Sequence, residues 1–550
     1  MRRTSMLLSL ALSLAMMSSS VGAQSSQFPT PDWFRTLTKR PPLPSQIPNA
    51  EHLRDYIVDG KFHLTLEQAI QLALANNTAV RVDELSFQSS AYGILAANGP
   101  FDPLFTSSFS ASRSSTPQST SLGGASVLSS LGQNFQSNYS QLFQTGTSFN
   151  ASVTVSRSNS NNSFNTFNPS LPSSISFSLS QPLLRNRGLF PNRAGILIAR
   201  RNLHQSRMNF EVQVSSIIQN VVSQYWSVVL ARENLDVLKK SVAQAQASYD
   251  HDKRALELGA LGPYDIFQSQ SQLASRKVAV TQAEYTLREL EDSLRVAIGA
   301  DLDSGVSALD LDLVEAPEPS GNLVTVDIGQ VITTAHAKRP EFEAQTDALV
   351  VDDYTIRLAH NQLQPSLNLS GFYTGSGLAG NLLDTSTTPP TVISATGLGA
   401  TLNQSIDFTS PTYGFTLSLS LPIRNRAAEA SLGTSEINKR RDLYNTRQVE
   451  ENIQLEARTA VNNLEVSKLS LAQALIARDL AVKNLEGEQK KYDLGLDSIF
   501  VLLQTQLQLT SAEQAVIQAQ VGYQLALVSV DHATGEILEH HHVEIKDPKL

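Results

Sequence analysis

The chain has 550 residues, of which 17% are charged and 41% are apolar, so it is too apolar to be a long disordered polyelectrolyte. Acidic residues outnumber basic ones by 51 to 42, which argues against nucleic acid as a main partner because phosphate binding requires a basic face. The absence of cysteine excludes disulfide frameworks, thiolate zinc sites, thiol nucleophiles and a lipid-modified cysteine anchor.

The N-terminus predicts an exported protein. Two arginines precede an apolar run from Met6 to Met17, and the small residues Val21-Gly22-Ala23 follow, a pattern typical of a secretory signal peptide over residues 1–23. A membrane anchor is the alternative, but an apolar helix of this length reaches about 18 Å against about 30 Å of hydrocarbon. Clustered prolines then predict an extended arm over residues 24–63.

The remaining chain contains two copies of one pattern. The segment Ile266–Leu273 (IFQSQSQL) matches Leu502–Leu509 (LLQTQLQL), and Leu179–Arg187 matches Leu419–Arg426 in the same order along the chain. Units this long are not solenoid repeats. We therefore predict a first repeat at 64–300, an acidic linker at 301–323, a second repeat at 324–535 and a polar tail at 536–550.

Each repeat contains a stretch with almost no charge. Residues 114–184 carry only Arg157, and residues 358–423 carry only Asp384 and Asp407. Apolar and small polar residues alternate there, which predicts membrane strands with lipid on one face and water on the other; a soluble β-sandwich is the alternative. The first repeat shows three candidate strands within 103–183, near 104–112, 147–156 and 174–181; the second shows two, at 366–374 and 411–422. The polar stretches 114–146 and 374–410 are expected to be loops.

The rest of each repeat predicts long helices. They span 193–258 and 264–298 in the first repeat, and 427–494 and 498–533 in the second. The first helix of each pair contains no proline and would be about 100 Å long at 1.5 Å per residue. In the second helices, apolar residues recur every seven positions with alanines beside them, a pattern typical of close-packed antiparallel coiled coils.

Three local patterns suggest chemistry only weakly. Gly375–Gly380 matches G-x-G-x-x-G but lies in an expected loop without the strand and helix that a dinucleotide site requires. His540, His541 and His542 favour adventitious metal affinity over a metal site, and Asp301–Gly305 lacks most ligands of a calcium loop. We expect no enzyme activity, no cofactor and no metal site.

Together these features resemble the TolC-type outer-membrane efflux protein family, over about residues 64–535. The segments that carry the resemblance are Leu64–Asn77, Ile328–Pro340, the strand-to-helix prolines Pro182 and Pro422, Gly259 with Ile266–Gln270, and Tyr492–Gly495 with Leu502–Gln506. Within the first of these segments, Thr65 and Gln68 form a predicted capping box.

The resemblance implies a mixed, mainly α fold. Each of two tandem repeats would contribute a membrane β-hairpin and long antiparallel coiled-coil helices. A homotrimer would close a 12-stranded β-barrel in outer-membrane lipid, continued by an α-helical periplasmic tunnel. It implies an outer-membrane channel of a tripartite export system, with a periplasmic adaptor protein and an inner-membrane transporter as partners, in a Gram-negative-type bacterium. No nucleic acid partner is expected.

The resemblance also implies functional positions at the tips of the helices. The candidate periplasmic gate comprises Asp265, Tyr492, Asp493 and Asp497. The turns that would dock the adaptor comprise Gly259, Leu261, Gly262, Gly495 and Leu496. Val501 and Gln504 depart from the family, which often carries aspartate at these positions. A trimeric coiled-coil surface stalk or adhesin with a barrel anchor is the alternative, although adhesins usually carry one anchor rather than two copies.

Overall fold

The computed structural model describes residues 52–119, 123–259, 262–264, 266–301, 303, 305–319, 321, 323–387 and 390–547. The predicted signal peptide and most of the predicted arm lie outside these residues. Every helix and strand described below belongs to one unit, residues 50–550.

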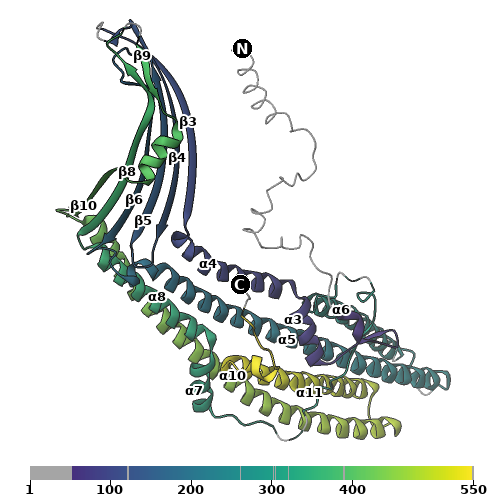
Figure 1. The fold of residues 1–550 in the computed structure, drawn as a ribbon. Helices are drawn as coiled ribbons and strands as arrows, with labels where there is room; N and C mark the ends of the chain where they lie inside the picture. Colours follow the sequence, from purple (N-terminus) through teal and green to yellow (C-terminus); the bar gives the residue numbers. More distant parts are fainter. Residues whose placement is uncertain are drawn as a thin grey trace, which may run out of the picture. The chain divides into compact units, whose positions relative to one another are not determined.

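A long antiparallel sheet forms the β part of this unit (Figure 1). Its strands are β3 (Leu104–Pro117), β4 (Val127–Leu142), β5 (Ser148–Ser160), β6 (Phe167–Pro182), β8 (Ser366–Asp384), β9 (Thr391–Ala395) and β10 (Ser410–Ser420). Neighbouring strands follow the order β10-β8-β6-β5-β4-β3, and β9 pairs with β8 beside this path. Strands from the two predicted repeats therefore meet at the β6–β8 pair.

The first repeat contributes four strands to the sheet, not the single hairpin that the family resemblance implies. Strand β4 lies in the stretch 114–146, so the prediction of a loop there is wrong. Its alternation is weak because Gly132, Gln133 and Asn134 interrupt it. Pairing on both sides compensates: the register places Phe135 of β4 opposite Phe109 of β3 and opposite Val155 of β5.

The predicted loop at 374–410 is also wrong. Strand β8 continues to Asp384, and helix α9 (Leu398–Ile406) packs on β8 and β6. The close approach requires glycine: a Cβ at Gly375 would lie 2.3 Å from the Ser405 carbonyl oxygen, and one at Gly377 would lie 2.2 Å from that of Thr401. The glycine pattern at 375–380 thus lies in a strand and packs against a helix.

The predicted long helices are confirmed within a few residues. The first pair is α5 (Leu189–Glu257) and α6 (Ile266–Ala297), and the second is α10 (Arg426–Asp493) and α11 (Ile499–Thr534). Within each pair the helices pack against each other and are joined by a short turn (Figure 1). Shorter helices precede the strands of each repeat: α3 (Leu66–Asn76), α4 (Thr78–Asn98), α7 (Ile328–Lys338) and α8 (Pro340–Gln362).

The start of α3 has the local structure that its sequence predicts. Thr65 accepts a hydrogen bond from the Gln68 backbone N–H, and the Gln68 side chain accepts one from the Thr65 N–H, which completes the capping box. Single-turn helices are η1 (Leu53–Tyr56), η2 (Gly99–Phe101) and α12 (Ile537–His540).

The largest core lies where α5 meets a small three-stranded sheet. This sheet comprises β1 (Ile57–Val58), β2 (Lys61–Leu64) and β7 (Leu311–Leu313), in the order β1-β2-β7. The predicted arm and the predicted linker therefore both contribute strands, and β2 pairs with β7 in parallel. Tyr225 of α5 is fully buried beneath them, and its hydroxyl bonds Glu315.

Two smaller cores hold the second pair of helices together. One contains Ala457, Leu464, Tyr523, Ala526 and other residues of α10 and α11, and α7 contributes Val331. The other lies at the tip of the pair. The seven-residue stripe predicted from the sequence supplies buried members of both cores, including Leu502, Tyr523 and Val530.

Candidate functional site

Both pairs of long helices end in turns that carry a glycine with positive φ. The angle is 73° at Gly259 and 70° at Gly495, a region that glycine enters without steric cost. Each glycine N–H donates a 2.9 Å hydrogen bond to the preceding turn, to the carbonyl of Leu256 or of Tyr492. The turns differ in sequence but end their helices in the same way.

These tips expose large apolar side chains. Leu258 and Tyr264 beside the first turn, and Leu494 and Leu496 at the second, are each between 73% and 84% exposed. Gly262 lies at the first turn and is exposed as well. Leu261 and Asp265 lie outside the described residues. Apolar groups exposed on short turns offer a surface to another protein.

Tyr492 links the two pairs of helices at their tips. Its hydroxyl donates a hydrogen bond of 2.6 Å to one carboxylate oxygen of Asp252 on α5. The Ser269 hydroxyl of α6 donates to the other oxygen. Asp252 is fully buried, so these bonds compensate for the loss of water around its carboxylate. The His251 ring lies 5.7 Å from the Tyr492 ring. We call Asp252, Ser269 and Tyr492 the tip clasp.

The other predicted gate residues make local contacts. Asp493 is exposed and accepts a 2.9 Å hydrogen bond from the Gln489 side chain one turn earlier on α10. Asp497 is half-buried and accepts a 2.8 Å bond from the Ser498 backbone N–H, beside the start of α11. Among the gate candidates that the structure describes, Tyr492 is therefore the one that bonds a residue of the first repeat.

Sequence reasoning missed Asp252 and Ser269. One signal was available in the repeat: Asp252 lies seven positions before Gly259, and Glu488 lies seven positions before Gly495. Both acids face inward near a turn, and Glu488 is bound by Lys491 at 2.5 Å. An acid at the same place in both copies is stronger evidence than one acid among many on a charged helix.

The two predicted joint prolines lie at or just beyond the ends of strands and do not start helices. Pro182 is the last residue of β6, where it lies opposite Asn368. Pro422 follows the end of β10 by two residues. Because α5 begins at Leu189 and α10 at Arg426, short connections separate each proline from the next helix. The missing N–H of proline suits the end of a strand ladder.

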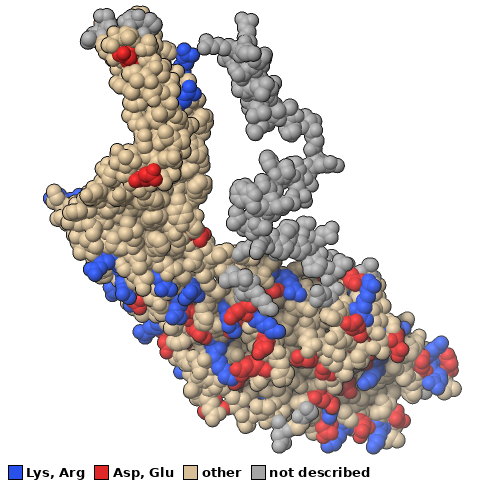
Figure 2. Space-filling view, viewed as in Figure 1, with Lys and Arg blue, Asp and Glu red and all other residues tan. Residues whose placement is uncertain are grey.

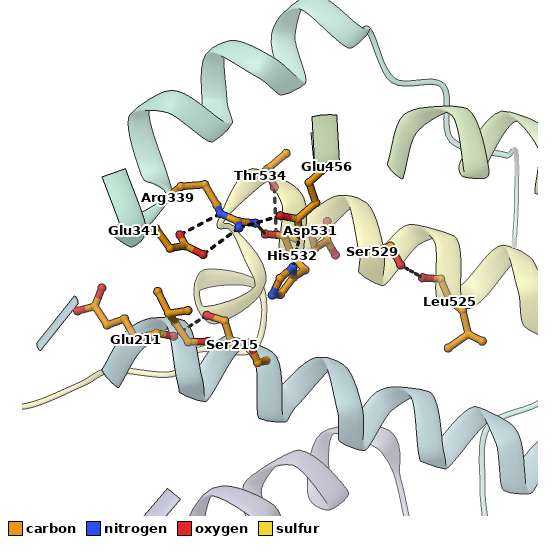
Figure 3. Close-up of polar contacts among 12 residues, drawn as sticks. Glu211, Ser215, Arg339, Glu341, Glu456, Leu525, Ser529, Asp531, His532 and Thr534 are labelled. Atoms are coloured by element: carbon orange, nitrogen blue, oxygen red, sulfur yellow. Dashed lines mark hydrogen bonds and ion pairs between the residues drawn. The ribbon is translucent and has the colours of Figure 1, made fainter. Parts of the chain in front are cut away.

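A second polar cluster braces the short helices of the second repeat against the long ones (Figure 3). Arg339, between α7 and α8, donates two bonds to Glu341 at 2.8 and 3.0 Å and one to Glu456 of α10 at 2.8 Å. It also donates to the His532 carbonyl of α11 at 3.0 Å. The His532 ring lies 2.9 Å from Glu456. We call Arg339, Glu341, Glu456 and His532 the α8 brace.

The ionisation of the α8 brace follows from these contacts. Burial raises the pKa of Glu456, but the hydrogen bonds from His532 and Arg339 outweigh burial and hold that pKa at about 2. Burial lowers the pKa of Arg339, and the bonds to Glu456 and Glu341 reverse this effect, so its pKa lies above the usual value. The brace therefore carries a stable carboxylate and a stable guanidinium at neutral pH.

One face of the long sheet is apolar, and no other part of the described chain covers much of this face. On β10, Tyr413, Phe415, Leu417 and Leu419 are mostly exposed, and Phe105 and Phe109 of β3 are too. On β10 the alternate positions from Thr412 to Ser420 are serine, threonine and glycine. Figure 2 shows the contrast in charge: the sheet is almost free of charged side chains, whereas the helices carry many of both signs.

Two of the three C-terminal histidines contact nearby acids. The His541 ring lies 3.1 Å from Glu67, and the His540 ring lies 3.1 Å from Asp531. Within the described residues, no group of histidines and acids is arranged to hold a metal ion. No helix in that part of the chain is both long enough and apolar enough to cross a membrane.

Comparison with protein families decides the identity. The family described as outer membrane efflux protein matches residues 147–300 and 331–536, which is more than half of the chain. The chain belongs to this family. Members of the family are outer-membrane transport channels and not enzymes, so this protein is located in the outer membrane of Gram-negative bacteria.

Curated relatives and solved structures agree with membership in the family. The chain is 22% identical over 325 residues to the probable efflux pump outer membrane protein TtgC and to the antibiotic efflux pump outer membrane protein ArpC, both of Pseudomonas putida. Each match covers 58% of this chain and 60% of the relative, so the chain aligns with less than two thirds of their length.

The fold matches solved channels across nearly the whole chain. The CmeC outer membrane channel of Campylobacter jejuni superposes with a TM-score of 0.61 at 18% identity, covering 90% of each chain. The outer membrane protein VceC of Vibrio cholerae gives 0.59 at 13% identity, covering 89% of this chain and 99% of that one. The predicted fold class, long antiparallel helices with strands of a TolC-type channel, is confirmed.

Proposed function

We propose that the protein is the outer-membrane duct of a tripartite export system. It conducts substrates passively from an inner-membrane transporter and a periplasmic adaptor to the exterior. The observation that carries this proposal is the long sheet, which combines an exposed apolar face and an uncharged polar face with helices rich in charge (Figure 2). Such a sheet suits a bilayer, and the helices suit an aqueous compartment.

We propose further that the duct is a homotrimer. The end strands of the sheet, β3 and β10, each have one edge without a strand partner in the described chain. In lipid an unpaired backbone group costs several kcal/mol, so a membrane sheet must close on itself. The smallest membrane barrels have about eight strands, more than this path contains, so closure requires further copies.

The division into two repeats, 64–300 and 324–535, supports the same proposal. Each repeat runs from short helices through strands to a pair of long helices, and the family match falls on one segment of each. A signal peptide over residues 1–23 fits this proposal, because an outer-membrane protein must first be exported.

The helical tips would form the periplasmic entrance and the adaptor site. The tip clasp would hold the entrance closed, because it ties the second pair of helices to the first through a buried carboxylate. Asp493 and Asp497, with Asp265, would attract cations at the entrance. Neutralising Asp493 and Asp497 should lower cation preference in planar bilayers; unchanged selectivity would contradict this role.

Two measurements test the duct. The purified protein should form trimers that conduct ions in planar bilayers, whereas a surface stalk would not conduct. In the native host, a photo-crosslinking residue at Leu496, which is 74% exposed at a tip, should capture an adaptor. The matched control is Leu455, which is 66% exposed midway along α10.

The expected result is adaptor capture from Leu496, with little from Leu455. The same probe at Leu261 should behave like Leu496, since both are proposed tip residues. Capture of other copies of this chain alone, or equal adaptor capture from Leu455, would contradict docking through the tips.

A further inference from the structure

The first repeat holds one hairpin more than the resemblance to the family implies. Strands β3 and β4 precede the residues that match the family, which begin at residue 147, next to β5. The two strands pair along 14 positions, from Leu104 opposite Ser140 to Pro117 opposite Val127. The position of this hairpin decides which strand forms the edge of the sheet.

The hairpin occupies the edge of β5. Strand β4 pairs with β5 from Ser130 opposite Ser160 to Leu142 opposite Ser148, which is the full length of β5. Strand β5 therefore has neighbours on both sides, β4 and β6. Among the described strands on this path, the edges left without a partner are those of β3 and β10, and every residue of β3 is exposed.

The hairpin also continues both faces of the sheet. On one face, Phe109, Phe135 and Val155 lie opposite one another across β3, β4 and β5. On the other face, the neighbouring rung contains Ser108, Gln136 and Thr154. A water-exposed extension would carry charge, yet the only charged residue within β3 and β4 is Arg113. The hairpin thus has the surface of a membrane wall.

The chain directions allow the two open edges to pair. Strand β3 follows helix α4 and runs away from the helices, whereas β10 leads back toward α10. A β3 edge placed beside the β10 edge of another copy is therefore antiparallel, like every other pair in the sheet.

We propose that β3 and β4 are part of the barrel wall and that β3 of each copy pairs with β10 of the next. This inference rests on the trimer proposed above. Three copies of the path β10-β8-β6-β5-β4-β3 then close eighteen strands, where the resemblance implies twelve. The occupant of each open edge is a second copy of this chain.

The added strands widen the pore. Barrel diameter grows roughly in proportion to the number of strands. With strands about 4.8 Å apart and tilted by about 40°, twelve strands give a backbone diameter of about 24 Å and eighteen give about 36 Å. The cross-section therefore roughly doubles, and barrels of about this strand number leave an aqueous channel.

Disulfide trapping distinguishes the two closures. The chain contains no cysteine, so engineered thiols react only with each other. Ser108 on β3 and Thr154 on β5 lie on the same rung, since both are paired with Gln136. Each is changed to cysteine and combined in turn with cysteine at Thr412, Thr416 or Ser418 of β10, on the full-length protein in membranes. Oxidation joins residues whose Cα atoms are within about 7 Å.

The expected result for Ser108→Cys, combined with at least one β10 position, is a ladder of disulfide-linked species up to the trimer. No such ladder is expected for Thr154→Cys. A ladder from Thr154→Cys but not from Ser108→Cys would overturn the inference, because β5 would then face the next copy. If neither forms a ladder, the inference also fails. Ion conductance by the unmodified trimer would still support the proposed duct in both of these cases, so the two proposals can fail separately.

Discussion

Replacing Tyr492 by phenylalanine should open the tips of the helices. The change removes the 2.6 Å hydrogen bond to Asp252 and leaves the ring in place. Hydrogen bonds to a charged group contribute about 1.5–3 kcal/mol, so the closed state should lose stability by a factor of roughly ten to a hundred. Asp252 is fully buried, which places the effect toward the upper end, although its carboxylate keeps the Ser269 hydroxyl and a 3.4 Å contact with the His251 ring.

Open probability in planar bilayers at neutral pH measures this effect. The matched control is Tyr264→Phe, the same chemical change at a tip residue that is 83% exposed, and it should leave the open probability unchanged. Equal open probabilities for Tyr492→Phe and the unmodified channel, with intact trimers in both, would refute the role of the tip clasp. An equal rise in the open probability of Tyr264→Phe would show that the surface of the tips, and not the tip clasp, controls opening.

Two further changes test packing and charge elsewhere. Glu456→Gln should make the stability of the fold less sensitive to acid. His532 and Arg339 hold the pKa of Glu456 at about 2, below the usual 4.5. The ionised carboxylate therefore contributes stability above pH 4.5, and this contribution is lost as the pH falls toward 2. Circular dichroism from pH 7 to 2 should show a smaller loss in the variant; an equal loss would contradict this. Gly377→Ala places a Cβ 2.2 Å from the Thr401 carbonyl and should displace α9. A cysteine at buried Thr401 should then gain maleimide reactivity, and unchanged labelling would contradict the clash.

The helices were predictable because their signal is local and repeated. The expected helix 427–494 differs from α10, Arg426–Asp493, by one residue at each end. Long stretches without proline, apolar stripes of fixed period and glycines at the turns all agree there. Agreement between independent signals is what made these boundaries accurate.

The missed elements depend on contacts that are distant in sequence. Strand β4 has large apolar residues at Phe135 and Tyr139, but Ser137 lies between them on the same face and Gln133 and Gln141 lie on either side, so its period of two is weak. Its pairing with β3 and β5 supplies the missing stability. Helix α9 is short, and it depends on Gly375 and Gly377 of β8 for room.

The sequence predicted only part of the candidate site, because the rest also depends on contacts between distant segments. Tyr492 lies beside a turn glycine, and its position in a recognisable motif identifies it. Its partner Asp252 is one acid on a long charged helix, and its burial becomes visible only when α5, α6 and α10 are packed together. Repeats can compensate for this loss of information, since Glu488 marks the equivalent place in the second copy.

The parallel pair of β2 and β7 has a consequence for the order of folding. It joins Phe62 to Leu311 and so brings together the two segments that flank the first repeat. Of the buried residues in the largest core, all but Val521 and Ile537 lie between Leu53 and Leu313. A chain that enters the periplasm from its N-terminus can therefore assemble most of this core before the second repeat has emerged. The second pair of helices then adds to a folded template, which limits the time that the residues of the largest core are exposed to other unfolded chains.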